Sequence, residues 1–186
     1  MRTLIRNFDT VSHNAQRLGK MASLFGIPLI STAQTAKVFG PTIKELNDVY
    51  ATFPETNKPA QFEKITFSMI DEQVRKHFSQ FEKSSVVLYG VEAHICVKQT
   101  CLDLLDMGYD VHLVIDSVSS MSYHDRTVGI ESLRDAGAYI TTFQSLAFEL
   151  ARSPEVQVYK DLLKLIKDMP KEHLSLYHDQ QQASKL

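Results

Sequence analysis

Residues 85–105 read SVVLYGVEAHICVKQTCLDLL, and this stretch decides the fold. It opens with a continuous apolar run at residues 86–89 that is rich in β-branched residues, which is typical of a strand buried on both faces. Gly90 ends the run. Apolar positions then recur at helical spacing, namely Val97, Cys101, Leu104 and Leu105. The stretch therefore predicts a buried strand, a sharp turn and a helix, with Cys96 at the first turn of that helix.

The predicted position of Cys96 favours a reactive thiolate. A helix N-terminus presents unpaired N–H groups and the positive end of the helix dipole, and both stabilise a negative charge. The thiolate is the nucleophilic form of cysteine. The arrangement is similar to a nucleophile elbow, although the G-x-S-x-G sequence is absent. The alternative is that Cys96 is a small buried apolar residue, as most free cysteines are. The residue pattern alone leaves both interpretations open.

Predicted strands and helices alternate along the rest of the chain. Further strands are expected at 28–32, 62–68, 110–115 and 138–142, and helices at 8–25, 42–49, 71–81, 126–136, 146–152 and 155–167. Asn7 or Asp9 is expected to cap the first helix, and Ser68 or Asp71 the helix at 71–81. This alternation predicts an α/β fold: a three-layer, doubly wound (Rossmann-like) parallel sheet with helices on both faces. Ligands of such sheets bind beyond the carboxyl ends of the strands.

Composition limits the classes of function. The chain has 186 residues, of which 44% are hydrophobic and 23% charged, as is usual for one globular domain. The formal net charge of −2 provides no basic field, so we do not expect a nucleic-acid partner. No apolar run approaches the length of a membrane span, and the N-terminus lacks the apolar core of a signal peptide, so no membrane partner is expected either.

The two cysteines and the last three residues indicate the cellular compartment in which we expect the protein. Two cysteines, Cys96 and Cys101, are too few for a disulfide framework and fit a reducing interior. The last three residues, Ser184-Lys185-Leu186, form a peroxisomal address, so we expect the peroxisomal matrix, and otherwise the cytoplasm. We expect one domain over residues 1–168, followed by a polar tail over 169–186.

Several separated motifs resemble the isochorismatase-like cysteine hydrolases, and most closely the branch called isochorismatase domain-containing proteins. The resemblance extends from about residue 5 to about residue 166. The segments that carry it are 27–34 (IPLISTAQ), 40–42 (GPT), 64–69 (KITFSM), 90–96 (GVEAHIC) and 114–120 (VIDSVSS). Several matches in the right order are much more specific than any one of them.

The resemblance implies a Cys-Lys-Asp catalytic triad, with Cys96 as the nucleophile and Lys64 as the lysine. An ammonium group near a thiol lowers the thiol pKa and stabilises negative charge as the thiolate attacks a carbonyl. The alternative for Lys64 is a solvated surface lysine beside Glu63, and its place in the KITFSM segment favours the catalytic role. We expect a small amide or ester substrate, with no cofactor and no metal. The Asp-x-His spacing at residues 110–112 is interpreted as strand sequence.

The resemblance also implies features around the nucleophile. A non-proline cis peptide is expected between Val91 and Glu92, which would direct the Glu92 and Cys96 N–H groups at a developing oxyanion. Gln34, Phe67 and His94 are candidates for lining the substrate pocket. Phe67 fits a core position equally well, and His94 fits a solvent-facing position equally well.

Two departures from the family pattern stand out. The family's aspartate lies at the end of a first strand that has no counterpart here, and Asp9 lies where the first helix begins. Loss of that central strand would leave two inner strands with unpaired edges, which is costly for buried backbone groups. Two explanations stay open: the sequence lacks an upstream segment that carries the strand, or the protein is a truncated form with altered packing and little activity. Ala33 replaces the glutamate that this branch usually carries.

The pattern therefore predicts one of two functions. The first is a cysteine-dependent hydrolase of a small amide or ester that uses Cys96 and Lys64, with isochorismate itself not expected as substrate. The second is a catalytically silent binding or interaction protein on the same fold, which the absent aspartate supports. The resemblance also implies a homo-oligomer.

Overall fold

Helices and parallel strands alternate along the chain in the computed structural model, which describes residues 2–82 and 85–175. The strands are β1 (Ile30–Gln34), β2 (Ala60–Lys64), β3 (Ser85–Val91), β4 (Asp110–Ser119) and β5 (Tyr139–Thr141). The helices are α1 (Phe8–Phe25), α2 (Ala36–Phe39), α3 (Lys44–Tyr50), α4 (Glu72–Phe78), α5 (Lys98–Asp106), α6 (Tyr123–Asp135), α7 (Phe143–Ala151) and α8 (Tyr159–Lys167). A 3₁₀ turn, η1, covers Glu55–Asn57, and a π-helical turn, η2, covers Ala93–Val97.

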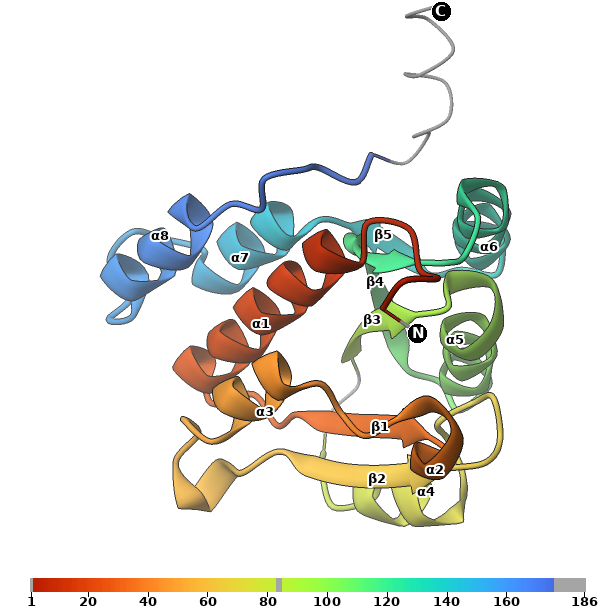
Figure 1. Cartoon of the computed structure of the whole chain (residues 1–186). Helices are drawn as coiled ribbons and strands as arrows, with labels where there is room; N and C mark the ends of the chain where they lie inside the picture. Colours follow the sequence, from red (N-terminus) through yellow and green to blue (C-terminus); the bar gives the residue numbers. More distant parts are fainter. Residues whose placement is uncertain (1, 83–84, 176–186) are drawn as a thin grey trace, which may run out of the picture.

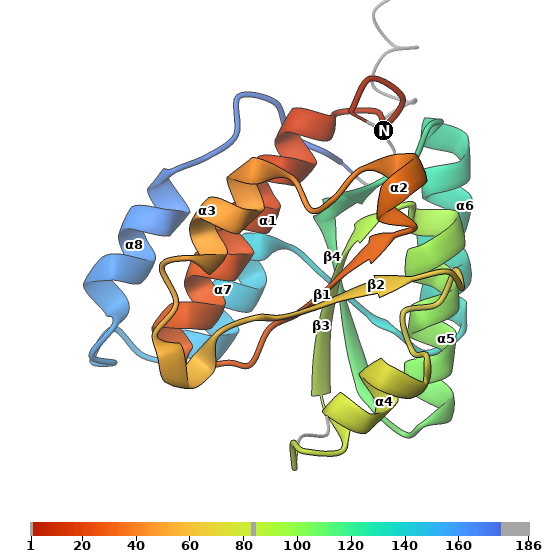
Figure 2. The same cartoon turned by 60° about the horizontal axis from the view of Figure 1, so that its bottom comes forward.

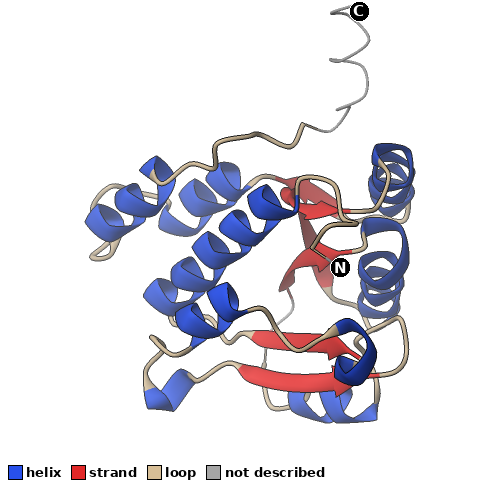
Figure 3. Ribbon diagram, viewed as in Figure 1, coloured by secondary structure: helices blue, strands red, loops and turns tan. Residues whose placement is uncertain are grey.

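The strands form two separate parallel sheets (Figure 3). One contains β1 and β2, and the other contains β3, β4 and β5 in that order. This confirms the predicted α/β fold with parallel strands and helices. Among the described residues, β1 and β3 do not pair with each other.

Helices cover both faces of the strands (Figure 1). One hydrophobic core lies between β3 and β4 and the helices α4, α5 and α6, with Val74, Leu104, Leu113 and Ile130 among its buried residues. A second core joins β4 to α1, α7 and α8 on the opposite face. A third, smaller cluster packs α3 and Phe53 beside the start of β1. The three layers expected from the sequence are therefore present.

Strand β4 is longer than the sequence predicts. The predicted strand ends at residue 115, but β4 continues through the Ser-rich run to Ser119. The physical reason lies in its partner: a register shift between Leu88 and Gly90 lets β3 pair again with the far end of β4. The predicted end of the strand at residue 115 was therefore wrong.

Helix α1 has the predicted bounds but not the predicted cap. Gly26 ends it with φ 64°, a left-handed conformation that glycine adopts without steric cost. Asn7 occupies the N-cap position, yet its side chain makes no cap hydrogen bond. Instead its amide donates to Glu172 Oε2 at 2.7 Å, and its carbonyl accepts from the Tyr123 hydroxyl. The cap predicted for α4 is confirmed, because Asp71 Oδ1 accepts from the Val74 N–H at 2.9 Å.

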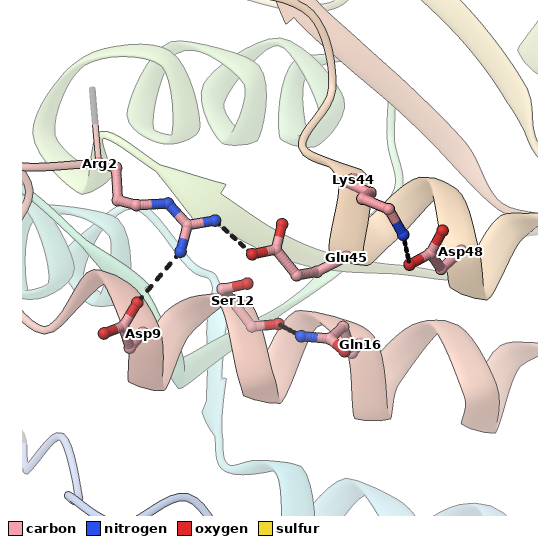
Figure 4. Close-up of polar contacts among 7 residues, drawn as sticks. All are labelled: Arg2, Asp9, Ser12, Gln16, Lys44, Glu45 and Asp48. Atoms are coloured by element: carbon pink, nitrogen blue, oxygen red, sulfur yellow. Dashed lines mark hydrogen bonds and ion pairs between the residues drawn. The ribbon is translucent and has the colours of Figure 1, made fainter.

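The N-terminal segment is attached to the fold at two places. Arg2 forms ion pairs with Asp9 of α1, at 3.4 Å, and with Glu45 of α3 (Figure 4). The Arg6 N–H donates to the Ser120 carbonyl at 3.0 Å, which fastens the segment to the carboxyl end of β4. The ion pairs are on the surface and add little stability, so the backbone bond is the more important attachment.

Buried Arg126 fastens the other end of the described chain. Its guanidinium donates to the carbonyls of Val118 at 2.9 Å, Ile115 at 2.5 Å and Ser175 at 2.8 Å. Burial lowers the pKa of Arg126 to about 10, so the group stays charged at neutral pH. Leu174 is buried as well, so residues 169–175 pack on the domain, and the boundary at residue 168 stays a prediction. The peroxisomal address at residues 184–186 lies outside the described residues.

Helix α6 packs closely against the turn that carries Cys96. A Cβ at Gly129 would lie 2.9 Å from the backbone N and Cα of His94, closer than folded proteins allow. Only glycine fits here without a shift of α6 away from η2.

Of the helices in residues 2–82 and 85–175, none is long and apolar enough to cross a membrane.

We predict that Gly129→Val lowers the free energy of unfolding by about 2 kcal/mol, because it overpacks a backbone contact. Urea titration followed by circular dichroism measures this change. The matched control is Val128→Ala, one residue away on an exposed position, which should change stability by less than about 0.5 kcal/mol. An unchanged unfolding midpoint in Gly129→Val would contradict the close packing of α6 on η2.

Candidate functional site

Cys96 lies in the π-helical turn η2 between β3 and α5. The Val97 N–H bonds to the Glu92 carbonyl five residues earlier, at 3.1 Å, which widens the turn and delays the start of α5 to Lys98. The prediction that Cys96 occupies the first turn of the α-helix was therefore wrong by two residues. Cys96 is half-buried, whereas Cys101 is fully buried in α5. The two thiols are thus in different environments.

Lys64 is the last residue of β2, and its side chain is buried, with 5% of the residue exposed. Its ammonium group donates to Gln34 Oε1 at 2.5 Å, to the Thr66 carbonyl at 2.9 Å and to the Phe67 carbonyl at 2.7 Å. All three acceptors are neutral oxygens, and together they accept from all three N–H groups of the ammonium. The alternative of a solvated surface lysine is therefore wrong.

Gln34 and Lys64 come together because their strands pair in register. Gln34 ends β1 directly opposite Lys64 at the end of β2. The Gln34 amide also donates to the Ile65 carbonyl at 2.7 Å, so one side chain holds both the ammonium and the loop that follows it. Phe67 lies on this loop and is 54% exposed, so the alternative that assigned it to the core was wrong.

The residues beside Cys96 contact the carboxyl end of β4. The peptide bond between Val91 and Glu92 is cis, as the resemblance implies. The buried Glu92 carboxylate accepts from the Met121 N–H at 2.9 Å. His94 is half-buried, with Nδ1 at 3.0 Å from the Ser120 hydroxyl. These two contacts were not predicted from the sequence, although the serines at residues 117–120 indicated that polar groups gather there.

The loop after Lys64 is attached to the helix that follows Cys96. The Met69 N–H donates to the Thr100 hydroxyl of α5 at 3.0 Å. Ile70 packs in the same core as Val97 and Cys101. Within the described residues, hydrogen bonds join Lys64 to Gln34 but not to Cys96. The candidate residues therefore form two groups. Gln34, Lys64 and Phe67 lie at the ends of β1 and β2 and on the loop after β2. Glu92, His94 and Cys96 lie on the turn between β3 and α5.

Two cavities lie near this end of the strands without including Cys96 or Lys64. An open one of about 560 Å³ is bordered by the N-terminal segment and Met121. The second, of about 230 Å³, is lined by Arg17, Asp116 and Phe143 among others. Burial raises the pKa of Asp116, although two hydrogen bonds from the Phe143 N–H and the nearby Arg17 charge oppose this shift. Asp116 has a structural role here, because it positions the start of α7.

Comparison with known proteins settles the family. A model of the isochorismatase domain matches residues 2–145, which is most of the chain. The chain belongs to the isochorismatase domain family. It is 38% identical over 169 residues to the secreted isochorismatase effector Isc1 of Phytophthora sojae, which covers 90% of this chain and 79% of the relative. It is 34% identical to human isochorismatase domain-containing protein 2, over 88% of this chain and 76% of the relative.

Solved structures agree with this assignment. A structure described as MAR1 ribonuclease from Caenorhabditis elegans superposes with a TM-score of 0.83 at 32% identity, over 94% of this chain and 89% of that chain. The YcaC gene product of Escherichia coli, described as an octameric hydrolase of unknown specificity, superposes with a TM-score of 0.78 at 23% identity. That match covers 98% of this chain and 87% of the other, and shows that the fold is shared.

We predict that iodoacetamide labels the folded protein once, at Cys96, and labels Cys101 only after unfolding. Cys101 is fully buried, and burial raises its pKa to about 11, so almost no thiolate forms there at neutral pH. Intact mass spectrometry counts the adducts. Cys96→Ala should abolish labelling of the folded protein, whereas Cys101→Ala should preserve it. Rapid labelling of Cys101 in the folded state would contradict the described packing of α5.

Proposed function

We propose that this protein is a cysteine-dependent hydrolase of a small amide or ester, with Cys96 as nucleophile and Lys64 as the charged assistant. The observation that carries the proposal is the buried ammonium of Lys64, which has only neutral acceptors among the described residues. A buried charge without a counterion is unfavourable unless an anion can approach it. A thiolate, or the negative charge that develops on a substrate, would supply that anion.

The proposed chemistry has two steps. The Cys96 sulfur attacks the substrate carbonyl carbon, the bond to the amine or alcohol breaks, and the thiol proton goes to that leaving group. Water then attacks the thioester and releases the acid, and the sulfur regains a proton. Lys64 stabilises the negative charge of each step, and the Glu92 and Cys96 N–H groups are the proposed oxyanion donors. Gln34, Phe67 and His94 are the proposed pocket residues.

A second candidate is a catalytically silent binding protein on the same fold. The observation that favours it is that, within the described residues, no carboxylate forms a hydrogen bond with Lys64. Full loss of turnover with retained ligand binding would favour this candidate. The two proposals therefore differ in whether Cys96 ever becomes covalently modified by substrate.

A small molecule is a better candidate ligand than RNA. One solved relative is described as a ribonuclease. The net charge of −2 does not favour binding to a phosphate backbone. We also propose that the protein is a homo-oligomer, which the octameric YcaC relative supports only by analogy of fold.

We predict that Cys96→Ala lowers hydrolysis of small amides and esters to the uncatalysed rate, and that Lys64→Met lowers kcat/KM by about 10²- to 10³-fold. The assay is a panel of small amides and nitrophenyl esters, with intact mass spectrometry to detect acylated Cys96. Cys101→Ala is the matched control, because it removes a thiol that takes no part in the reaction. It should retain activity within about twofold.

Two results would decide against the hydrolase. Undiminished turnover in Cys96→Ala would exclude a role for its sulfur. The absence of both turnover and acylation across the panel, with the protein folded, would favour the silent binding protein.

A further inference from the structure

A cavity of about 230 Å³ lies between α1, β4 and the start of α7. The segment after α8 forms part of its wall, because Met169 and Leu174 line the cavity. This segment runs beside the first half of α1, where the Glu172 carbonyl accepts from the Thr10 hydroxyl at 3.2 Å (Figures 1 and 2). The cavity is therefore bordered by parts of the chain that are far apart in the sequence.

Arg17 supplies a buried positive charge to this cavity. The residue is 4% exposed, and its guanidinium lies over the Phe143 ring at 3.8 Å from the ring centre. It donates to Asn14 Oδ1 at 2.8 Å and to the carbonyls of Leu165 at 2.9 Å and Ile166 at 3.3 Å. These three neutral acceptors leave two of the five guanidinium N–H groups without an acceptor among the described residues.

Asp116 supplies a negative charge to the same cavity. Both of its carboxylate oxygens accept from the Phe143 N–H, at 3.0 and 3.2 Å, which leaves most of their lone pairs available. Burial lowers the pKa of Arg17 and raises that of Asp116, and the attraction between the two charges opposes both shifts. Among the described residues, neither charge forms an ion pair. The cavity therefore contains two opposite charges that lack a direct counterion.

The cavity is small and partly apolar. Its volume of about 230 Å³ is below the range of about 300–1,000 Å³ that is typical of drug-sized ligands. Phe143 and Leu174 are buried beside it, and half-buried Pro170 continues this apolar part of the wall. A ligand that fills the cavity is therefore a small molecule with a short apolar portion.

We propose that this cavity binds a small zwitterionic amino acid with a short aliphatic side chain, whose carboxylate accepts from Arg17 and whose ammonium donates to Asp116. A guanidinium with two free N–H groups suits a carboxylate, because charge-assisted hydrogen bonds are strong. A simple anion or cation would match one charge and be repelled by the other, whereas a zwitterion matches both. The aliphatic side chain would then lie against Phe143 and Leu174.

The test measures binding of L-alanine, L-valine and L-leucine to the full chain by saturation-transfer NMR. At least L-valine should bind saturably, with a Kd below about 1 mM. Its analogues 3-methylbutanoate, which lacks the ammonium, and L-valinamide, which lacks the carboxylate, should each bind at least about tenfold more weakly. The three molecules share one carbon skeleton, so this difference isolates the two charged groups.

Two variants assign the binding to this cavity. Asp116→Asn keeps the shape of the side chain and removes its charge, so the preference for L-valine over 3-methylbutanoate should disappear. Met169→Trp should block the cavity and abolish binding, and Met169 is 53% exposed, so a larger side chain is tolerated there. The matched control is Phe148→Trp, which is 42% exposed on α7 outside the cavity and should bind L-valine as the unaltered chain does. Circular dichroism verifies that each variant is folded.

Three results would overturn the proposal. They are no saturable binding of any of the three amino acids up to about 10 mM, equal binding of L-valine and 3-methylbutanoate, and unchanged binding in folded Met169→Trp. Equal binding would indicate a simple anion site at Arg17. Neither Cys96 nor Lys64 lines this cavity and no hydrolysis is measured, so failure here would leave the proposed hydrolase unaffected.

Discussion

The pairing of β3 with β4 is the interaction on which the rest of the structure depends. β4 contributes Leu113 to the core under α4, α5 and α6, and Val114 to the core under α1, α7 and α8. The register shift after Leu88 lets the end of β3 pair again with Ser119. This second pairing places Glu92 and His94 beside Met121 and Ser120. The turn that carries Cys96 is therefore positioned by β4.

The other half of the candidate site depends on a separate, smaller sheet. Pairing of β1 with β2 brings Gln34 opposite Lys64, and the loop that follows folds its carbonyls around the ammonium. The two halves are joined through the loop and α5, where Met69 bonds to Thr100. Within the described residues the two sheets share no strand pairing, so the distance between Cys96 and Lys64 is governed by other contacts between the sheets. Any element that joins the sheets would stiffen this arrangement.

Helix bounds and caps were predicted well where a short sequence pattern alone determines them. The apolar period of α1 and the glycine at its end gave the observed bounds, and Asp71 was recognised as the cap of α4. The end of β4 was missed because its serines are turn-formers by propensity, and only pairing with Gly90 and Val91 makes them a strand. Such long-range pairing is not encoded in any short window.

The family resemblance supplied the candidate site residues, but the sequence could not predict their burial or their hydrogen-bond partners. Burial of Lys64 and its three neutral acceptors follow from strand register and loop conformation, neither of which local pattern specifies. The π-helical turn around Cys96 likewise depends on a hydrogen bond across five residues.

The contacts of Arg126 determine how the C-terminal end of the chain can be truncated. Because its guanidinium binds the Ser175 carbonyl, shortening the polypeptide before that residue would leave a charged donor enclosed without its acceptor, whereas cutting after it would preserve the bond.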